Sequence, residues 1–118
     1  MDSSNSLNEN LADNGGTRTA LKALKKKLAK TKNSETQFKS EQFTTDQMFF
    51  IGFGTMWCNN ESLEYLNLLK QTCDTSSSCH PRAKIRVNGV VSNMEDFAEA
   101  FSCPLDSPMN PSTKCKLW

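Results

Sequence analysis

The sequence predicts a mainly α-helical chain, because its clearest local signals are helical and only one segment carries a strand signal. Leucines recur at three- and four-residue spacing in 20–32, and an apolar run at 48–57 follows a capping-box pattern. Leucines spaced for one helix face recur at 61–70. Only residues 85–91, around an Asn-Gly pair, are typical of a short hairpin or extended segment.

Composition limits what the chain can do alone. It has 118 residues, of which 36% are hydrophobic, so little apolar material is available for an independent core. A net charge of +1 creates no global field for nucleic acid, and we predict no nucleic-acid partner. The chain has neither a run of about 18 apolar residues nor a cationic, apolar leader, so we predict no membrane span, signal or anchor within it.

Five cysteines in so short a chain indicate an oxidising compartment. Their odd number means that at least one stays free or pairs outside the chain. A secreted protein that has lost its N-terminal part would reconcile the cysteines with the missing signal.

At the N-terminus, residues 1–8 are polar and are predicted to be disordered if nothing packs on them. A helix is predicted through Glu9–Asp13, where two carboxylates four residues apart share one face and need a compensating cation or donor. The following Asn14-Gly15-Gly16 either ends this helix with a left-handed cap or marks a close backbone approach within a longer helix.

Residues 20–32 predict an amphipathic helix with a lysine-rich face. A solvated face over the leucines is the favoured interpretation. A helix that binds membrane surfaces, nucleic acid or other acidic partners is the alternative, which the lack of interleaved aromatic residues weakens. Residues 33–42 are a polar linker.

Thr44 and Gln47 form a capping-box pattern for a helix that starts near Thr45. The run at 48–57 is apolar on every side, so we predict that it is buried on all sides by protein that this chain does not supply. A helix over 61–70 follows, and then a Ser/Thr-rich loop.

The Asn-Gly pair within 85–91 predicts the hairpin turn. Ser92 with Glu95 predicts the cap of a final helix. The proline-containing tail after it is expected to be a turn-rich loop held at Cys103 and Cys115.

Three motifs occur in a fixed order along the chain. They are Glu9-Asn-Leu-Ala-Asp13-Asn-Gly-Gly16, His80 with Arg86, and Ser107-Pro-Met-Asn-Pro111 leading into Cys115-Lys-Leu-Trp118. Together they resemble the C-terminal portion of the neprilysin and endothelin-converting enzyme family of zinc metallopeptidases. The resemblance implies that 9–118 is the C-terminal part of a thermolysin-like, gluzincin-type catalytic domain, in an extracellular or plasma-membrane ectodomain.

The resemblance also implies roles for single residues. Glu9 is similar to the third ligand of one zinc ion, and Asp13 to the carboxylate that orients a ligating histidine. His80 resembles the histidine that donates to the oxyanion, and Arg86 the arginine that holds a substrate backbone carbonyl. Ser78 stands where the family usually has an acidic residue that supports the histidine.

Further residues are matched in the same way. Met56 and Trp57 match positions that line the pocket for a large hydrophobic substrate residue. Cys58, Cys103 and Cys115 match cysteines whose partners lie outside this chain, whereas Cys73 and Cys79 are close enough in sequence to pair locally. Asn60 begins a glycosylation sequon.

The chain lacks His-Glu-x-x-His, which would supply two zinc ligands and the general base. We therefore expect that it does not hold zinc alone and is inactive alone. The resemblance implies a segment of a zinc metalloendopeptidase that cleaves small peptides before hydrophobic residues, with the missing N-terminal part as its partner. The alternative is a short, non-catalytic polypeptide that acts as a binding module.

Overall fold

The computed structural model describes residues 6–31, 42–75 and 80–115. Its helices are α1 (Leu7–Lys30), α2 (Thr45–Met56), α3 (Leu63–Thr75), α4 (Ala83–Val91) and α5 (Glu95–Ala100). Within those ranges there is no strand, and Ser107 and Asn110 form an isolated β-bridge. The mainly α-helical prediction is confirmed. None of the helices in the described part of the chain is both long enough and apolar enough to span a membrane.

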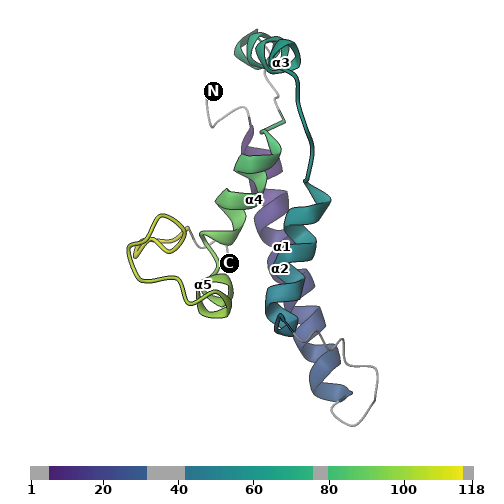
Figure 1. The fold of residues 1–118 in the computed structure, drawn as a ribbon, viewed down its shortest axis with the longest axis vertical. Coiled ribbons are helices and arrows are strands. Elements are labelled where there is room, and N and C mark those ends of the chain that lie inside the picture. The colour runs from purple at the N-terminus through teal and green to yellow at the C-terminus, as the bar shows by residue number, and fades with distance from the viewer. Residues whose placement is uncertain (1–5, 32–41, 76–79, 116–118) are drawn as a thin grey trace.

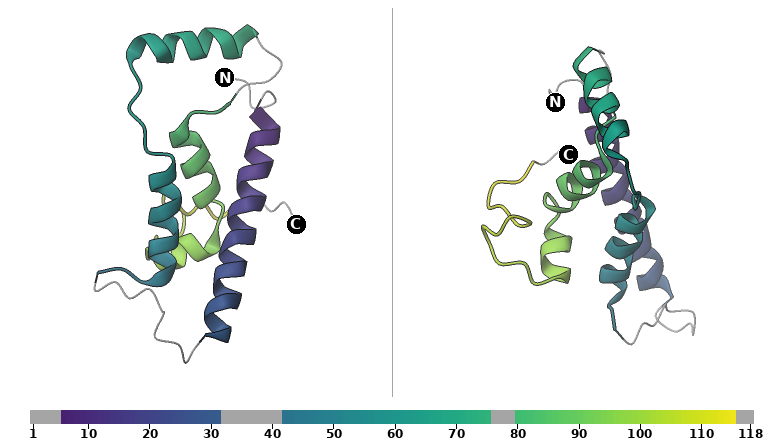
Figure 2. Two further views of the ribbon diagram at one scale, coloured as in Figure 1. Left: turned by 90° about the vertical axis from the view of Figure 1, so that its right-hand side faces the viewer. Right: turned by 45° about the horizontal axis from the view of Figure 1, so that its top comes forward.

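The helices α1, α2 and α4 lie side by side, and α5 packs below α4 (Figures 1 and 2). Figure 2 shows α3 lying across the end of this group. Three large apolar side chains of α3 remain exposed, namely Leu63, Tyr65 and Leu68. The chain therefore forms a small packed body with one helix that it leaves largely uncovered.

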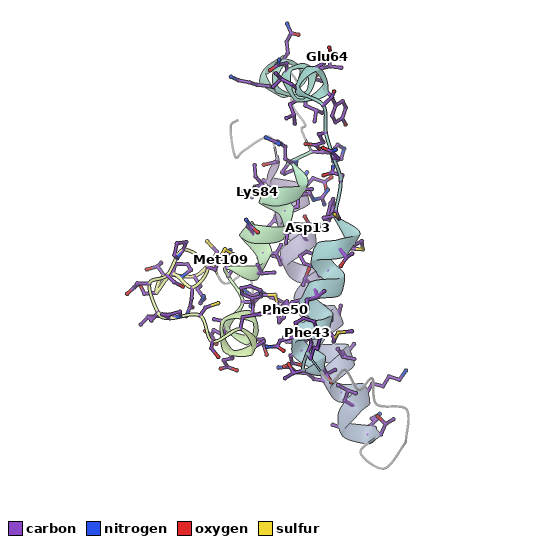
Figure 3. The ribbon with its side chains drawn as sticks, viewed as in Figure 1. Asp13, Phe43, Phe50, Glu64, Lys84 and Met109 are labelled. Atoms are coloured by element: carbon purple, nitrogen blue, oxygen red, sulfur yellow. The ribbon has the colours of Figure 1, made fainter. Side chains whose placement is uncertain are left out.

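The core is built from one face of each packed helix. Leu21 of α1, Phe50 of α2 and Val90 of α4 are all buried, together with Met94 before α5. Phe50 meets Phe97 of α5 edge to face, with ring centroids 5.2 Å apart, and Figure 3 shows its position on α2 beside α5. This cluster fixes α1, α2, α4 and α5 relative to one another.

The long helix α1 joins two segments that the sequence left separate. It starts at Leu7, inside the segment predicted to be disordered, whereas residues 1–5 lie outside the described residues. The helix continues through Gly15 and Gly16, so the left-handed cap is wrong. A Cβ placed on Gly16 would meet no atom within 4 Å, and this chain supplies no close backbone approach there.

The capping box of α2 is confirmed. The Gln47 backbone N–H donates to the Thr44 hydroxyl over 3.2 Å, and the Thr44 N–H donates to the Gln47 side chain over 2.9 Å. The chain covers only part of the surface of this apolar helix. Phe50 is buried, whereas Met48, Ile51 and Met56 are exposed.

The predicted hairpin at 85–91 is wrong, because these residues form α4. A type I′ turn needs positive φ at its central residues, and no glycine in the described ranges has one. As a helix, the segment buries Val90 and Val91, each worth about 1.5–3 kcal/mol, which outweighs the cost of about 1 kcal/mol for Gly89 within a helix. Tertiary packing therefore overrides the local turn signal.

The final helix exists as predicted, but its cap is different. Ser92 ends α4, and Met94 precedes α5 without a side-chain cap. The Asn93 side chain donates to the Gly89 carbonyl over 2.8 Å. Ser92 and Asn93 therefore cap the C-terminal end of α4 and not the N-terminal end of α5. The tail is rich in turns, and the Asn110 side chain donates to the Cys103 carbonyl over 2.9 Å.

Candidate active site

Four residues singled out in the sequence come together in the structure. Glu9 and Asp13 lie one turn apart on α1, His80 precedes α4, and Arg86 lies within α4. We call these four residues the acidic–basic cluster. More than 60 residues of sequence separate its two halves, and Figure 3 shows Asp13 where α1 faces α4.

Arg86 holds both carboxylates of the cluster. Its Nε and Nη2 donate to the two oxygens of Asp13 over 2.5 and 2.7 Å, and Nη2 also lies 2.6 Å from Glu9 Oε2. This fork geometry matches a carboxylate and gives strong, charge-assisted hydrogen bonds. Arg86 therefore supplies the cation that the like-charged pair on α1 requires.

Burial strengthens this contact. The side chains of Arg86 and Asp13 are only 13% and 12% exposed, and that of Glu9 is 30% exposed. The hydrogen bonds that Arg86 donates to Asp13 raise the pKa of Arg86, burial opposes the rise, and the charge of Glu9 adds to it. The guanidinium is therefore fully charged at neutral pH.

Trp57, at the end of α2, packs against the acidic–basic cluster through Arg86. The Arg86 Cζ atom lies 4.2 Å from the centroid of the indole ring, which is a cation–π contact. The Trp57 Nε1 is buried without a hydrogen-bond partner in this structure. Residues from α1, α2 and α4 thus meet at Arg86.

His80 occupies the open side of the cluster. Its side chain is 78% exposed, and its Nδ1 lies 3.0 Å from Glu9 Oε1. In the sequence, Ser78 stands where the family usually has an acidic residue that supports this histidine. Ser78 lies outside the described residues, and Glu9 is the carboxylate that the structure places against His80.

Met56 and Trp57 line a cavity of about 470 Å³ between α1 and α2. Its remaining walls consist of Ala12, Asp13, Gly16, Thr17, Ala20, Phe49, Gly52 and Phe53. Met56 is 72% exposed, and Trp57 joins the cavity to the acidic–basic cluster. Both predicted pocket residues therefore lie beside an apolar cavity next to the cluster.

Within the described ranges, no group of three or more His, Cys, Asp or Glu side chains is placed to hold a metal ion. Glu9 offers carboxylate oxygens, which are suitable zinc ligands, but one carboxylate is not a ligand set. Both of its oxygens face cationic or ionisable partners, His80 and Arg86. The described residues therefore do not form a zinc site by themselves.

The five cysteines fall into two groups, according to whether the structure describes their side chains. Cys58, Cys103 and Cys115 are unpaired in the described structure. The predicted local disulfide between Cys73 and Cys79 lies outside the part of the chain that the structure describes, because neither the Cys73 side chain nor residue Cys79 is described. Asn60, the sequon residue, is exposed.

The sequence model of peptidase family M13 matches residues 1–117. The chain is 41% identical over 111 residues to neprilysin-1 of Caenorhabditis elegans, a match that covers 93% of this chain and 14% of that protein. It is 37% identical over 114 residues to rat endothelin-converting enzyme 1, covering 95% and 14%, and 37% identical over 114 residues to Drosophila melanogaster neprilysin-2, covering 97% and 14%. The chain thus spans about one-seventh of the length of these relatives.

Proposed function

The chain belongs to peptidase family M13, and we propose that it is the C-terminal segment of a neprilysin-like zinc metalloendopeptidase. The complete enzyme would hydrolyse small peptides before hydrophobic residues. The observation that carries the proposal is the convergence of Glu9, Asp13, His80 and Arg86 from α1 and the α4 region.

We assign the metal-side role to α1. Glu9 would supply one of three protein ligands to zinc, which when bound polarises a carbonyl and activates water. Asp13 would orient a histidine ligand from the part of the enzyme outside this chain. The Arg86 fork supports this role, because it fixes the Asp13 carboxylate at a buried position.

We assign the substrate-side role to His80 and Arg86. His80 is exposed, so it can exchange its contact with Glu9 for a hydrogen bond to the oxyanion, a donor whose loss typically costs about 2.7–4 kcal/mol. The contacts of Arg86 with the two carboxylates use Nε and Nη2, and we assign Nη1 to the backbone carbonyl of the substrate. Met56 and Trp57 would face the hydrophobic substrate residue.

The remaining polypeptide of such an enzyme is the partner that we propose for this chain. Three unpaired cysteines and an α3 helix with exposed Leu63 and Leu68 are expected if further protein covers them. The abundance of cysteines supports an extracellular or plasma-membrane ectodomain.

Replacement in a relative tests the proposal. A chimera of C. elegans neprilysin-1 in which this chain substitutes for the aligned 111 residues should bind one zinc ion and hydrolyse peptides, whereas the isolated chain should do neither. In the chimera, Glu9→Gln should lower zinc content, and Lys84→Gln, on the exposed side of α4, serves as the control. A folded chimera without zinc, or peptidase activity in the isolated chain, would refute the assignment.

A further inference from the structure

The second half of α1 carries a continuous row of cations. From Arg18 to the last residue of the helix, every fourth residue is basic, and we call this set the cationic ridge: Arg18, Lys22, Lys26 and Lys30. Residues four apart are neighbours on a helix surface, so the ridge follows α1 for about 18 Å. The three lysines are exposed, and Arg18 is half-buried.

The chain does not neutralise the cationic ridge. No acidic residue occurs between Asp13 and Glu35, so this part of α1 supplies no carboxylate. Asp46 of α2 and Asp96 of α5 approach the helix, but both pair with Lys25, which is not part of the ridge. Among the described residues, no ridge side chain forms a salt bridge. Since like charges four residues apart destabilise a helix, an anion from outside the chain would relieve a cost that the chain retains.

A small cavity lies at the Arg18 end of the ridge. Arg18 Nη2 donates to the Asn93 carbonyl over 2.7 Å, whereas Arg18 Nε is buried without a hydrogen-bond partner in this structure. This half-buried guanidinium therefore lacks the carboxylate that would compensate its charge. The cavity has a volume of about 130 Å³, and its walls consist of Arg18, Thr19, Leu21, Lys22, Lys25, Met94 and Asp96. Because a water molecule occupies roughly 30 Å³, the cavity leaves room for a compact anion.

The surroundings of the ridge limit the class of anion. Leu21 is buried in the core and Leu24 packs against it, so α1 has already used the apolar face that a membrane-surface helix would insert among lipids. Protein interfaces are depleted in lysine and enriched in aromatic residues, and single-stranded nucleic acid stacks on aromatic side chains. Residues 14–32 contain no aromatic residue. Evenly spaced cations without an apolar anchor fit a linear polymer that carries a charge on each unit.

We propose that the cationic ridge binds a sulfated polysaccharide, with one sulfate group at the cavity beside Arg18 and further sulfate groups along the three lysines. Sulfated polysaccharides are extracellular, so the choice of this polymer rests on the compartment given under the proposed function. Lysine suits the role because its ammonium group, on a flexible stem, can follow an irregular spacing of sulfates. The ridge shares no residue with the acidic–basic cluster or with the cavity at Met56 and Trp57, so binding does not depend on peptidase activity.

Heparin is the sulfated probe, and calorimetric titration of the whole chain at a series of salt concentrations gives its affinity. Four ion contacts predict a slope of about −3 for log affinity against log salt, which is a loss of roughly fiftyfold between about 50 and about 200 mM. Lys22→Gln with Lys26→Gln should reduce the slope to about −1.4 and weaken binding by at least about tenfold at the lower salt concentration. Glutamine is a good helix former, so circular dichroism should show unchanged helix content.

Two matched double variants serve as controls. Lys70→Gln with Lys84→Gln removes the same charge from exposed positions on α3 and α4, and should leave the heparin affinity within about twofold. Lys22→Arg with Lys26→Arg keeps the charge of the ridge and should keep the affinity. Equal losses in the ridge and control glutamine variants would overturn the proposal, because attraction would then depend on net charge alone.

The remaining outcomes identify the polymer and separate the ridge from the proposed function. Equal binding of desulfated heparin would overturn the proposal. So would tighter binding of oligothymidylate, or of vesicles of equal parts phosphatidylcholine and phosphatidylserine, than of heparin. In the chimera with C. elegans neprilysin-1, an active enzyme that does not bind heparin would overturn the ridge assignment alone. A chimera that binds heparin but folds without zinc or peptidase activity would instead refute the proposed function and leave the ridge in place.

Discussion

Replacing Arg86 by methionine should be the most damaging single change to the acidic–basic cluster. Methionine keeps most of the length of the side chain but removes the cation that holds Glu9 and Asp13. Removing one partner of a buried ion pair costs about 3–5 kcal/mol, because the other charge is left uncompensated. Since Arg86 and Asp13 keep 13% and 12% exposure, we expect the lower end, about 3 kcal/mol, which includes the lost contact with Trp57.

The measurement is urea unfolding of the chain, followed by far-ultraviolet circular dichroism. Arg86→Lys should lose about 1.5 kcal/mol, because an ammonium keeps the charge without the two parallel donors. In an Asp13→Asn background, Arg86→Met should cost only about 1 kcal/mol, because the buried carboxylate is gone. If Arg86→Met shifts the free energy of unfolding by less than about 0.5 kcal/mol, as at an ordinary surface site, the cluster does not join α1 to α4.

Three further outcomes are expected. The hydrogen bond to Asp96 raises the pKa of Lys25 above its ordinary value of 10.5, so this contact stabilises the fold below pH 10.5 and its contribution is lost as the pH rises further. In urea unfolding at a series of pH values, Lys25→Met should abolish this loss of stability at alkaline pH. The loss should amount to no more than about 1 kcal/mol, because both side chains are more than 40% exposed. Thr44→Ala removes the capping hydrogen bond of α2 and should lower the free energy of unfolding by about 1 kcal/mol, whereas Thr44→Ser should retain most of it. Phe50→Ala empties the centre of the core and should cost about 3–5 kcal/mol in the same assay, while Phe43→Ala, at an exposed position, should cost far less; similar losses at both sites would contradict the assigned core.

Local chemistry made the helices predictable. Thr44 and Gln47 cap α2 through groups three residues apart, so the sequence alone contains both partners. The leucine spacing within 20–32 likewise identified Leu21 as a core residue of a helix. The hairpin prediction from Asn88-Gly89 was wrong because the turn preference of this pair is weak compared with the burial of Val90. That burial depends on packing against α1, which the local sequence does not encode.

The site was predictable only in part. The spacing of Glu9 and Asp13 showed that they share a helix face and need a cation, but no local pattern identified Arg86 as that cation. Resemblance to a family placed His80 and Arg86 in the same site, and the structure adds that His80 contacts Glu9 directly. Contacts across more than 60 residues depend on how α4 packs on α1, which periodicity does not encode.

The arrangement of the cluster has a consequence for how such a site is assembled. Two carboxylates one turn apart repel each other, and a metal ion is one way to compensate them. Here Arg86 offsets the repulsion between the two carboxylates from within the same chain, at a buried position where the fork fits both oxygens of Asp13. The packing of α4 on α1 therefore suffices to orient Glu9 and Asp13. A carboxylate that is held in this way needs little further ordering before it binds a ligand, which favours the zinc-binding role that we propose for Glu9.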